Sequence, residues 1–141
     1  MIDREDPAHV SPVEERRPTV VLADDHPAVL VAFGQLLEAS CDVVASVPNG
    51  HQAVQTVASL KPDVLVVDLM MPDLDGLEVC RRVRQVSPDT AVVIVTAFHD
   101  AQVRKIAIRD GASDFVSKVH ASDQLEAAIQ RIAAARLELG T

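Results

Sequence analysis

One stretch of the sequence constrains the fold more than any other: the apolar run from Val64 to Val67, which ends on the single carboxylate of Asp68. A Val/Leu run without polar alternation is typical of a strand that is buried on both faces, as in a parallel sheet. Asp68 then lies at the carboxyl end of a buried strand, where open α/β sheets bind their ligands. Because an isolated buried carboxylate is very unfavourable, Asp68 must be hydrated, paired or metal-bound.

Apolar strand segments and amphipathic helix segments alternate along the whole chain. The predicted strands are residues 19–23, 42–47, 64–68, 91–95 and 112–116. The predicted helices are residues 27–37, 52–60, 76–86, 100–110 and 122–137. This alternation with short connections is typical of a doubly wound α/β fold, in which helices cover both faces of a parallel sheet. Right-handed crossovers leave few topologies, and 2-1-3-4-5 is the expected strand order.

Residues at the ends of these segments predict where helices begin and end. Ser122 is expected to be the N-cap of the last helix. Gly111 is expected to close the helix before it. Asp73 and Asp75 are expected to serve the turn and the N-cap of helix 76–86 rather than a metal ion.

Length and composition indicate one domain. The chain has 141 residues and is 48% hydrophobic, which suffices for a core over residues 18–138. Residues 1–17 mix prolines with charges without periodicity, so we expect a flexible N-terminal tail; residues 139–141 are expected to be the C-terminal end or the start of a linker. Neither a signal-peptide pattern nor a membrane-length apolar run is visible, so we expect a cytoplasmic protein with no membrane contact. The net charge of −8 argues against direct nucleic-acid contact by this chain.

Polar side chains follow the predicted strands at their carboxyl ends. Asp24 and Asp25 follow the first strand, and Asp68 ends the third. Thr96 ends the fourth strand, and the fifth runs to Lys118. The carboxyl ends of parallel strands share one edge of a sheet. The sequence therefore predicts three carboxylates, one hydroxyl and one ammonium group around one shallow pocket.

These residue types indicate a cation and a phosphoryl group. Clustered carboxylates repel each other, and a divalent cation relieves the repulsion. Oxygen ligands without a Cys or His cluster favour Mg²⁺, and His26 and His99 are therefore interpreted as loop histidines. Lys118 supplies a positive charge that suits a phosphoryl group or a carboxylate. Thr96 can donate a hydrogen bond to a phosphoryl oxygen, and the small Ala97 beside it leaves the pocket open. Such surroundings allow a carboxylate to form an acyl phosphate.

Four motifs follow one another along the chain: VVLADDHP (residues 20–27), VDLMMPDLDG (67–76), VIVTA (93–97) and GASDFVSK (111–118). Together and in this order they resemble the receiver domain of two-component response regulators, and the resemblance covers about residues 19–137. The first motif is most similar to regulators of the NarL/LuxR type, whose full-length members carry a C-terminal helix-turn-helix.

The resemblance implies a flavodoxin-like receiver fold and a role for each residue of the predicted pocket. Asp68 would accept the phosphoryl group from a sensor histidine kinase, and Thr96 and Lys118 would hold it. Mg²⁺ would be the cofactor. Its ligands would be Asp68, Asp25 directly, Asp24 chiefly through water, and the backbone carbonyl of Met70.

Further positions are implied to transmit or tune the signal. Phe115 occupies the place of a switch aromatic that moves inward as Thr96 is drawn to the phosphoryl group, and it replaces the more usual tyrosine. Met70, Ala97 and Phe98 occupy tuning positions beside the site. Val119 stands where the family usually has a proline after its lysine. The surface that changes on phosphorylation would comprise the predicted helix 100–110, strand 112–116 and helix 122–137.

The expected function is a phosphorylation-activated switch that controls an output, transcription through a helix-turn-helix absent from this sequence. The alternative is a phosphorylation-independent dimerisation or interaction module on the same fold, and a homodimer is possible in either case. A dedicated phosphatase of the aspartate-nucleophile kind would carry a second Asp where Met70 stands. We therefore expect a phosphoacceptor rather than an enzyme, with no activity beyond slow autophosphorylation from small donors and autodephosphorylation.

Overall fold

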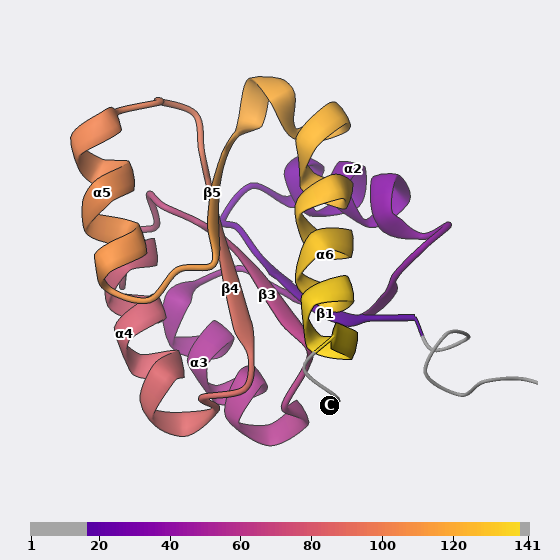
Figure 1. Cartoon of the computed structure of the whole chain (residues 1–141). Helices are drawn as coiled ribbons and strands as arrows, with labels where there is room; N and C mark the ends of the chain where they lie inside the picture. The colour runs from indigo at the N-terminus through magenta and orange to yellow at the C-terminus, as the bar shows by residue number, and fades with distance from the viewer. Residues whose placement is uncertain (1–16, 139–141) are drawn as a thin grey trace, which may run out of the picture.

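In a computed structural model, residues 17–138 are described, and the rest of the predicted tail and residues 139–141 lie outside the described residues. Five parallel strands form one sheet in the order β2-β1-β3-β4-β5, which confirms the predicted fold (Figure 1). The strands are β1 (Thr19–Ala23), β2 (Asp42–Val47), β3 (Val64–Asp68), β4 (Ala91–Thr96) and β5 (Asp114–Ser117). The helices are α2 (Pro27–Leu37), α3 (Gly50–Leu60), α4 (Gly76–Val86), α5 (Ala101–Arg109), the short 3₁₀ helix η2 (Lys118–His120) and α6 (Ala121–Glu138).

Helices cover both faces of the sheet, α2 and α6 on one and α3, α4 and α5 on the other (Figure 1). Successive side chains of a strand point to opposite faces. In β3, Val64 and Val66 therefore pack under α2 and α6, whereas Leu65 and Val67 pack under the other three helices. Burial on both faces explains why this strand has no polar alternation. Within residues 17–138, no helix is long and apolar enough to cross a membrane.

The end of α5 shows why one strand prediction was wrong. Gly111 closes this helix, as predicted, with a φ of 108°. Its N–H donates to the carbonyl of Ile108 at 3.0 Å, and the N–H of Ala112 donates to that of Ala107 at 2.9 Å. This is the Schellman arrangement of a helix C-terminus. Because the cap uses residues 111 and 112, β5 begins at Asp114 rather than at residue 112.

The predicted N-cap at Ser122 was also wrong. Helix α6 begins at Ala121 and follows η2 without a break. The cap belongs to η2, where the Ser117 hydroxyl accepts a hydrogen bond from the N–H of Val119 at 3.3 Å. Val119 therefore supplies a donor that a proline at this position would lack.

Helix α4 begins directly against the backbone of the central strand, and this contact yields a stability prediction. A Cβ at Gly76 would lie 2.9 Å from the carbonyl oxygen of Asp68 and 2.9 Å from the Cα of Leu69. We expect Gly76→Ala to lower the free energy of unfolding by about 1–3 kcal/mol in urea denaturation, since backbone must move.

The matched control for that substitution is Gly34 in α2, where an added Cβ meets nothing within 4 Å. We expect Gly34→Ala to be neutral or to stabilise the fold by up to about 1 kcal/mol, because Ala is the better helix former. Equal effects of the two substitutions would contradict the steric explanation.

Candidate functional site

The carboxyl ends of four strands bring the predicted pocket residues to one edge of the sheet. Asp68 ends β3 and pairs in register with Val95 of β4. Thr96, the next residue of β4, pairs with Ser117, which immediately precedes Lys118. Asp24 directly follows β1. Strand register thus places these residues together although they lie far apart in the sequence.

Lys118 connects two of the carboxylates. Its Nζ lies 2.8 Å from Oδ2 of Asp24 and 3.4 Å from Oδ2 of Asp68. Both carboxylate side chains are only 4% exposed. Desolvation opposes the charged ammonium, but the hydrogen bond with Asp24 and the charge of Asp68 outweigh it and raise the pKa of Lys118. Lys118 therefore stays charged and is shared between two buried carboxylates.

One cation does not balance the negative charge around Asp68. Burial of this carboxyl group, followed by the charge of Asp24, raises its pKa above the usual aspartate range. Lys118 and a hydrogen bond from the backbone N–H of Met70 offset this only in part. An additional positive charge at this place would favour the ionised form of Asp68.

Asp25 and His26 complete a cluster of possible metal ligands. Oδ1 of Asp25 is buried without a hydrogen-bond partner, and Nδ1 of His26 lies 3.1 Å from it outside hydrogen-bond geometry. One ligand atom each of Asp24, Asp25, His26 and Asp68 lie within 4.8 Å of one another. An unsatisfied carboxylate oxygen among other donors fits a divalent cation. His26, interpreted from the sequence as a loop histidine, thus lies beside the predicted ligands Asp24 and Asp25.

Thr96 is fully buried, and the loop after β4 engages its hydroxyl. The hydroxyl accepts a hydrogen bond from the N–H of Phe98 and donates one to the Phe98 carbonyl, both at 3.1 Å. The Phe98 side chain itself is exposed, as are Ala97 and Met70. The three predicted tuning positions are thus accessible to solvent.

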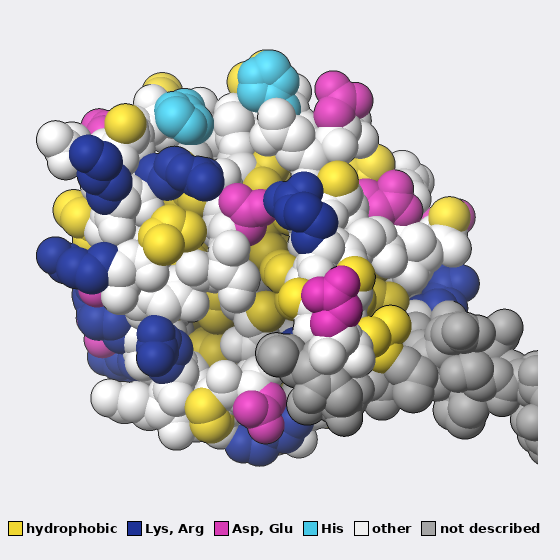
Figure 2. Space-filling model, in the orientation of Figure 1, with side chains coloured by type: hydrophobic (Ala, Val, Ile, Leu, Met, Phe, Trp, Pro, Cys, Tyr) yellow, Lys and Arg dark blue, Asp and Glu magenta, His cyan; other side chains and the backbone are white. Residues whose placement is uncertain are grey.

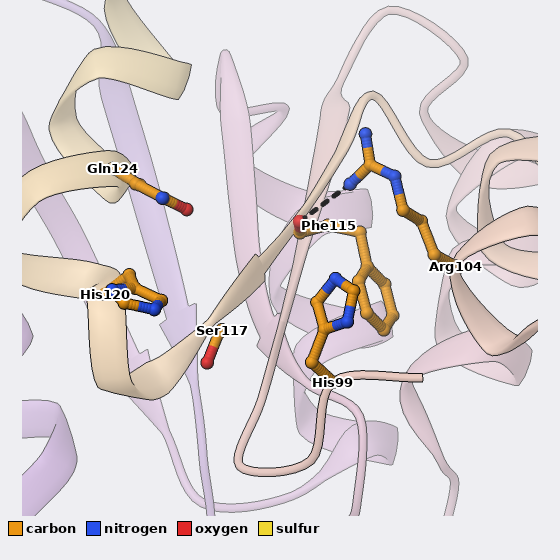
Figure 3. A pocket seen from close by; sticks show the side chains of 6 residues that line it. All are labelled: His99, Arg104, Phe115, Ser117, His120 and Gln124. Carbon is orange, nitrogen blue, oxygen red and sulfur yellow. Dashed lines mark hydrogen bonds between the residues drawn. The ribbon is translucent and has the colours of Figure 1, made fainter. Parts of the chain in front are cut away.

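Phe115 lies in β5 and its ring is buried, with the ring of His99 packed against it edge to face at a centroid distance of 6.3 Å. Nη1 of Arg104 donates a hydrogen bond to the Phe115 carbonyl at 3.0 Å, and Figure 3 shows both neighbours beside the ring. Together with Ser117, His120 and Gln124 these residues line a groove of about 320 Å³ between α5 and α6. Figure 2 shows apolar side chains in this hollow and basic side chains over α4 and α5 beside it.

Comparison with known proteins identifies the family. The sequence profile of the response regulator receiver domain matches residues 20–130. The chain belongs to this family. Residues of the receiver domain are 34% identical over 113 positions to the response regulator MprA of Mycobacterium ulcerans, covering 80% of this chain and 49% of that protein. They are 32% identical over 123 positions to a putative transcriptional regulator of Pseudomonas aeruginosa, covering 86% of this chain and 59% of that protein.

Solved structures agree with this assignment. The signal receiver domain of the putative regulator NarL from Mycobacterium tuberculosis superimposes with a TM-score of 0.80 at 27% identity, over 84% of this chain and 98% of that one. A LuxR-family two-component response regulator from Aurantimonas sp. gives a TM-score of 0.81 at 30% identity, over 85% of this chain and 87% of that one. The receiver domain spans about half the length of the curated relatives that it matches.

Besides its expected place in the turn after β3, Asp73 of the receiver domain holds a second helix. Its Oδ1 accepts the N–H of Gly50 at 2.9 Å, and its Oδ2 accepts the N–H and Nδ1 of His51 at 2.9 and 2.8 Å. Asp73 therefore holds the N-terminus of α3, a contact across more than twenty residues of sequence. Asp75 caps α4 as predicted, by accepting the N–H of Glu78 at 2.9 Å.

This contact makes the stability of α3 pH-dependent. Desolvation opposes ionisation of Asp73, but hydrogen bonds from the backbone N–H groups of His51, Gly50 and Leu74 outweigh it and hold the pKa well below 3.8. A lowered folded-state pKa adds stability above the unfolded-state value, and this is lost as pH falls through the folded-state value.

We expect Asp73→Asn to cost about 1 kcal/mol of unfolding free energy at pH 7, because an amide has one acceptor oxygen, whereas the two carboxylate oxygens of Asp73 accept the N–H groups of Gly50 and His51. The difference from wild type should shrink steadily as urea denaturation is repeated from pH 5 down to the acid limit of the fold. A difference that grows on acidification would contradict the assignment. His51 contributes to the same contact, so Asp73→Asn should be repeated in a His51→Ala background.

Proposed function

We propose that this receiver domain accepts a phosphoryl group on Asp68 from a sensor histidine kinase and works as a phosphorylation-controlled switch. The observation that carries the proposal is the position of Asp68. Its carboxylate ends the central strand 3.4 Å from Lys118, in a cluster of donors that fits a divalent cation. The membership of the chain in the receiver family supports the same role.

The reaction is transfer of a phosphoryl group to a carboxylate. An oxygen of Asp68 attacks phosphorus, the bond from phosphorus to the donor's imidazole nitrogen breaks, and an acyl phosphate forms. Mg²⁺ would be held by Asp68, by Asp25 directly and by the Met70 carbonyl, and bound there it would neutralise charge on the transferred group. Both oxygens of Asp24 already have partners, Lys118 and the N–H of His26, which supports a role for Asp24 through water.

Lys118 and Thr96 would hold the product. Lys118 exchanges its contact with the Asp68 carboxylate for one with a phosphoryl oxygen, which keeps the buried charge paired. Thr96 leaves the Phe98 backbone and donates its hydroxyl proton to another phosphoryl oxygen. Moving a two-state domain from mostly inactive to mostly active needs about 5 kcal/mol of differential binding, which a few charge-assisted hydrogen bonds can supply.

The output surface in this proposal comprises α5, β5 and α6. Phe115 connects it to the site, because Ile94 of β4, two residues before Thr96, pairs in register with Phe115. The ring is already buried, so the phosphoryl group would stabilise this inward position rather than create it. The relatives are longer than this chain, and we propose that residues 18–138 control an output domain of the helix-turn-helix kind, with a homodimer as one means of control.

The test is phosphorylation of the wild-type protein with a small phosphodonor, followed by intact mass spectrometry and sedimentation. We expect the mass of one added phosphoryl group with Mg²⁺ and none after chelation, and a changed sedimentation coefficient or changed NMR shifts in α5, β5 and α6. Beryllofluoride should reproduce the conformational change. A folded protein that takes up nothing would favour the phosphorylation-independent interaction module instead.

A further inference from the structure

His26 has a place in the carboxylate cluster that helix capping does not explain. It is the N-cap residue of α2, a position that favours Ser, Thr, Asp or Asn because their side chains bind the first N–H groups of the helix. The His26 side chain makes no such bond. Its Nδ1 instead lies 3.2 Å from Oδ1 of Asp24 and 3.1 Å from Oδ1 of Asp25.

These separations match those of neighbouring ligands on one metal ion. An octahedral ion with ligands at about 2.0–2.2 Å has adjacent ligand atoms about 3 Å apart. The Asp68 carboxylate, from β3 across the sheet edge, completes a set of four ligand atoms within 4.8 Å of one another. The arrangement therefore suits the carboxylate oxygens of Asp25 and Asp68 and the imidazole nitrogen of His26 around a single ion, with Asp24 acting through water.

The hydrogen bonds around His26 are compatible with a role of its imidazole as a metal ligand. Nδ1 of His26 is also within hydrogen-bond distance of Oδ1 of Asp24, at 3.2 Å, but that oxygen already accepts the backbone N–H of His26 at 2.9 Å, so it does not depend on the imidazole. Oδ1 of Asp25 is buried, faces Nδ1 and makes no hydrogen bond with it. A cation between these two atoms would satisfy Oδ1 of Asp25, and Nδ1 would exchange its contact with Asp24 for one with the ion.

We propose that His26 ligates the cation through Nδ1 and makes this site selective for transition-metal ions such as Mn²⁺ over Mg²⁺. The proposal rests on the proposed function, because it uses the same carboxylates. Mg²⁺ is a hard ion that binds oxygen, whereas the first-row transition ions accept imidazole readily. The imidazole thus adds affinity for the second class of ion and little for the first. The side chain is 67% exposed, so it can turn onto the ion without disturbing the core.

The experiment uses Mn²⁺ as the probe, with pulsed electron paramagnetic resonance and calorimetric titration of both ions. In wild type we expect hyperfine coupling between Mn²⁺ and a ligating nitrogen. In His26→Ala that coupling should disappear, Mn²⁺ should bind at least about tenfold more weakly, and Mg²⁺ affinity should stay within about twofold. His120→Ala is the matched control, since His120 is an exposed histidine beside Lys118 at the same end of the sheet. This variant should bind both ions with the affinity of wild type.

The outcomes separate this inference from the proposed function. Wild type that binds Mg²⁺ and is phosphorylated with it, but gives Mn²⁺ spectra without nitrogen coupling, would overturn the role of His26 alone. An equal loss of affinity for Mn²⁺ and Mg²⁺ in His26→Ala would overturn the proposed selectivity. Wild type that binds neither ion would overturn the cation site itself and His26 with it. Because the wild-type spectrum is decisive, the inference stays testable even if the variant is unstable.

Discussion

Asp68→Asn is expected to reduce phosphoryl uptake to the background level, the largest functional effect of any single substitution in this domain. An amide oxygen is a poor nucleophile, and no other described carboxylate combines this burial with a direct contact to Lys118 except Asp24, whose oxygens both have partners. The measurement is intact mass after incubation with a small phosphodonor and Mg²⁺.

The fold should survive this substitution. Folding raises the pKa of Asp68, so its ionised form is unfavourable in the folded protein, and its contribution to stability is complete at low pH and lost as pH rises through the folded-state pKa. At pH 7 without metal, Asp68→Asn should therefore be as stable as wild type or more stable. Thermal unfolding with and without Mg²⁺ measures this.

Asp75→Asn is the matched control for Asp68→Asn. Asp75 lies in the loop after the same strand but caps α4, and asparagine is an equally good N-cap. This variant should be phosphorylated like wild type. An added phosphoryl mass on the Asp68→Asn protein would refute Asp68 as the acceptor. An equal loss of phosphorylation in both variants would also refute it.

Lys118→Met is expected to produce the second large effect, on both stability and phosphorylation. Removing the ammonium leaves Asp24 and Asp68 buried without their shared cation, which should cost about 3 kcal/mol of unfolding free energy. Phosphorylation should slow by about 10²–10³-fold, because a positive charge aimed at the transferred group is lost. Urea denaturation and phosphorylation rates measure the two effects.

The response of Lys118→Met to Mg²⁺ distinguishes two causes of its lower stability, the loss of the Lys118 charge and the loss of its packing. If charge balance is the cause, Mg²⁺ should restore part of the lost stability of Lys118→Met, whereas a packing defect would not respond to the ion. Lys105→Met on the exposed face of α5 is the control and should change neither stability nor rate. An unchanged free energy of unfolding in Lys118→Met would contradict the shared ion pair.

The strand pattern explains why so much of the site could be predicted. An unbroken apolar run such as β3 has only one environment that fits it, the middle of a parallel sheet, and the carboxyl ends of parallel strands necessarily share an edge. The residues that end β1, β3 and β4 were therefore placed together from sequence periodicity alone. Boundaries were predicted less well, as at Ser122, because caps depend on hydrogen bonds that compete locally.

The sequence by itself determined the alternation of strands and helices, the shared edge at the carboxyl ends of the parallel strands and the residue types on that edge, since these follow from periodicity and chain connectivity; the strand order was an expectation that the structure confirmed. Only the tertiary structure decided which side chains touch. It assigned Asp73 to α3, joined the Thr96 hydroxyl to the Phe98 backbone and turned His26 toward two carboxylates. The physical reason is that periodicity fixes the face on which a residue lies, whereas hydrogen bonds depend on ångström-scale distances between segments that approach only when the core has packed.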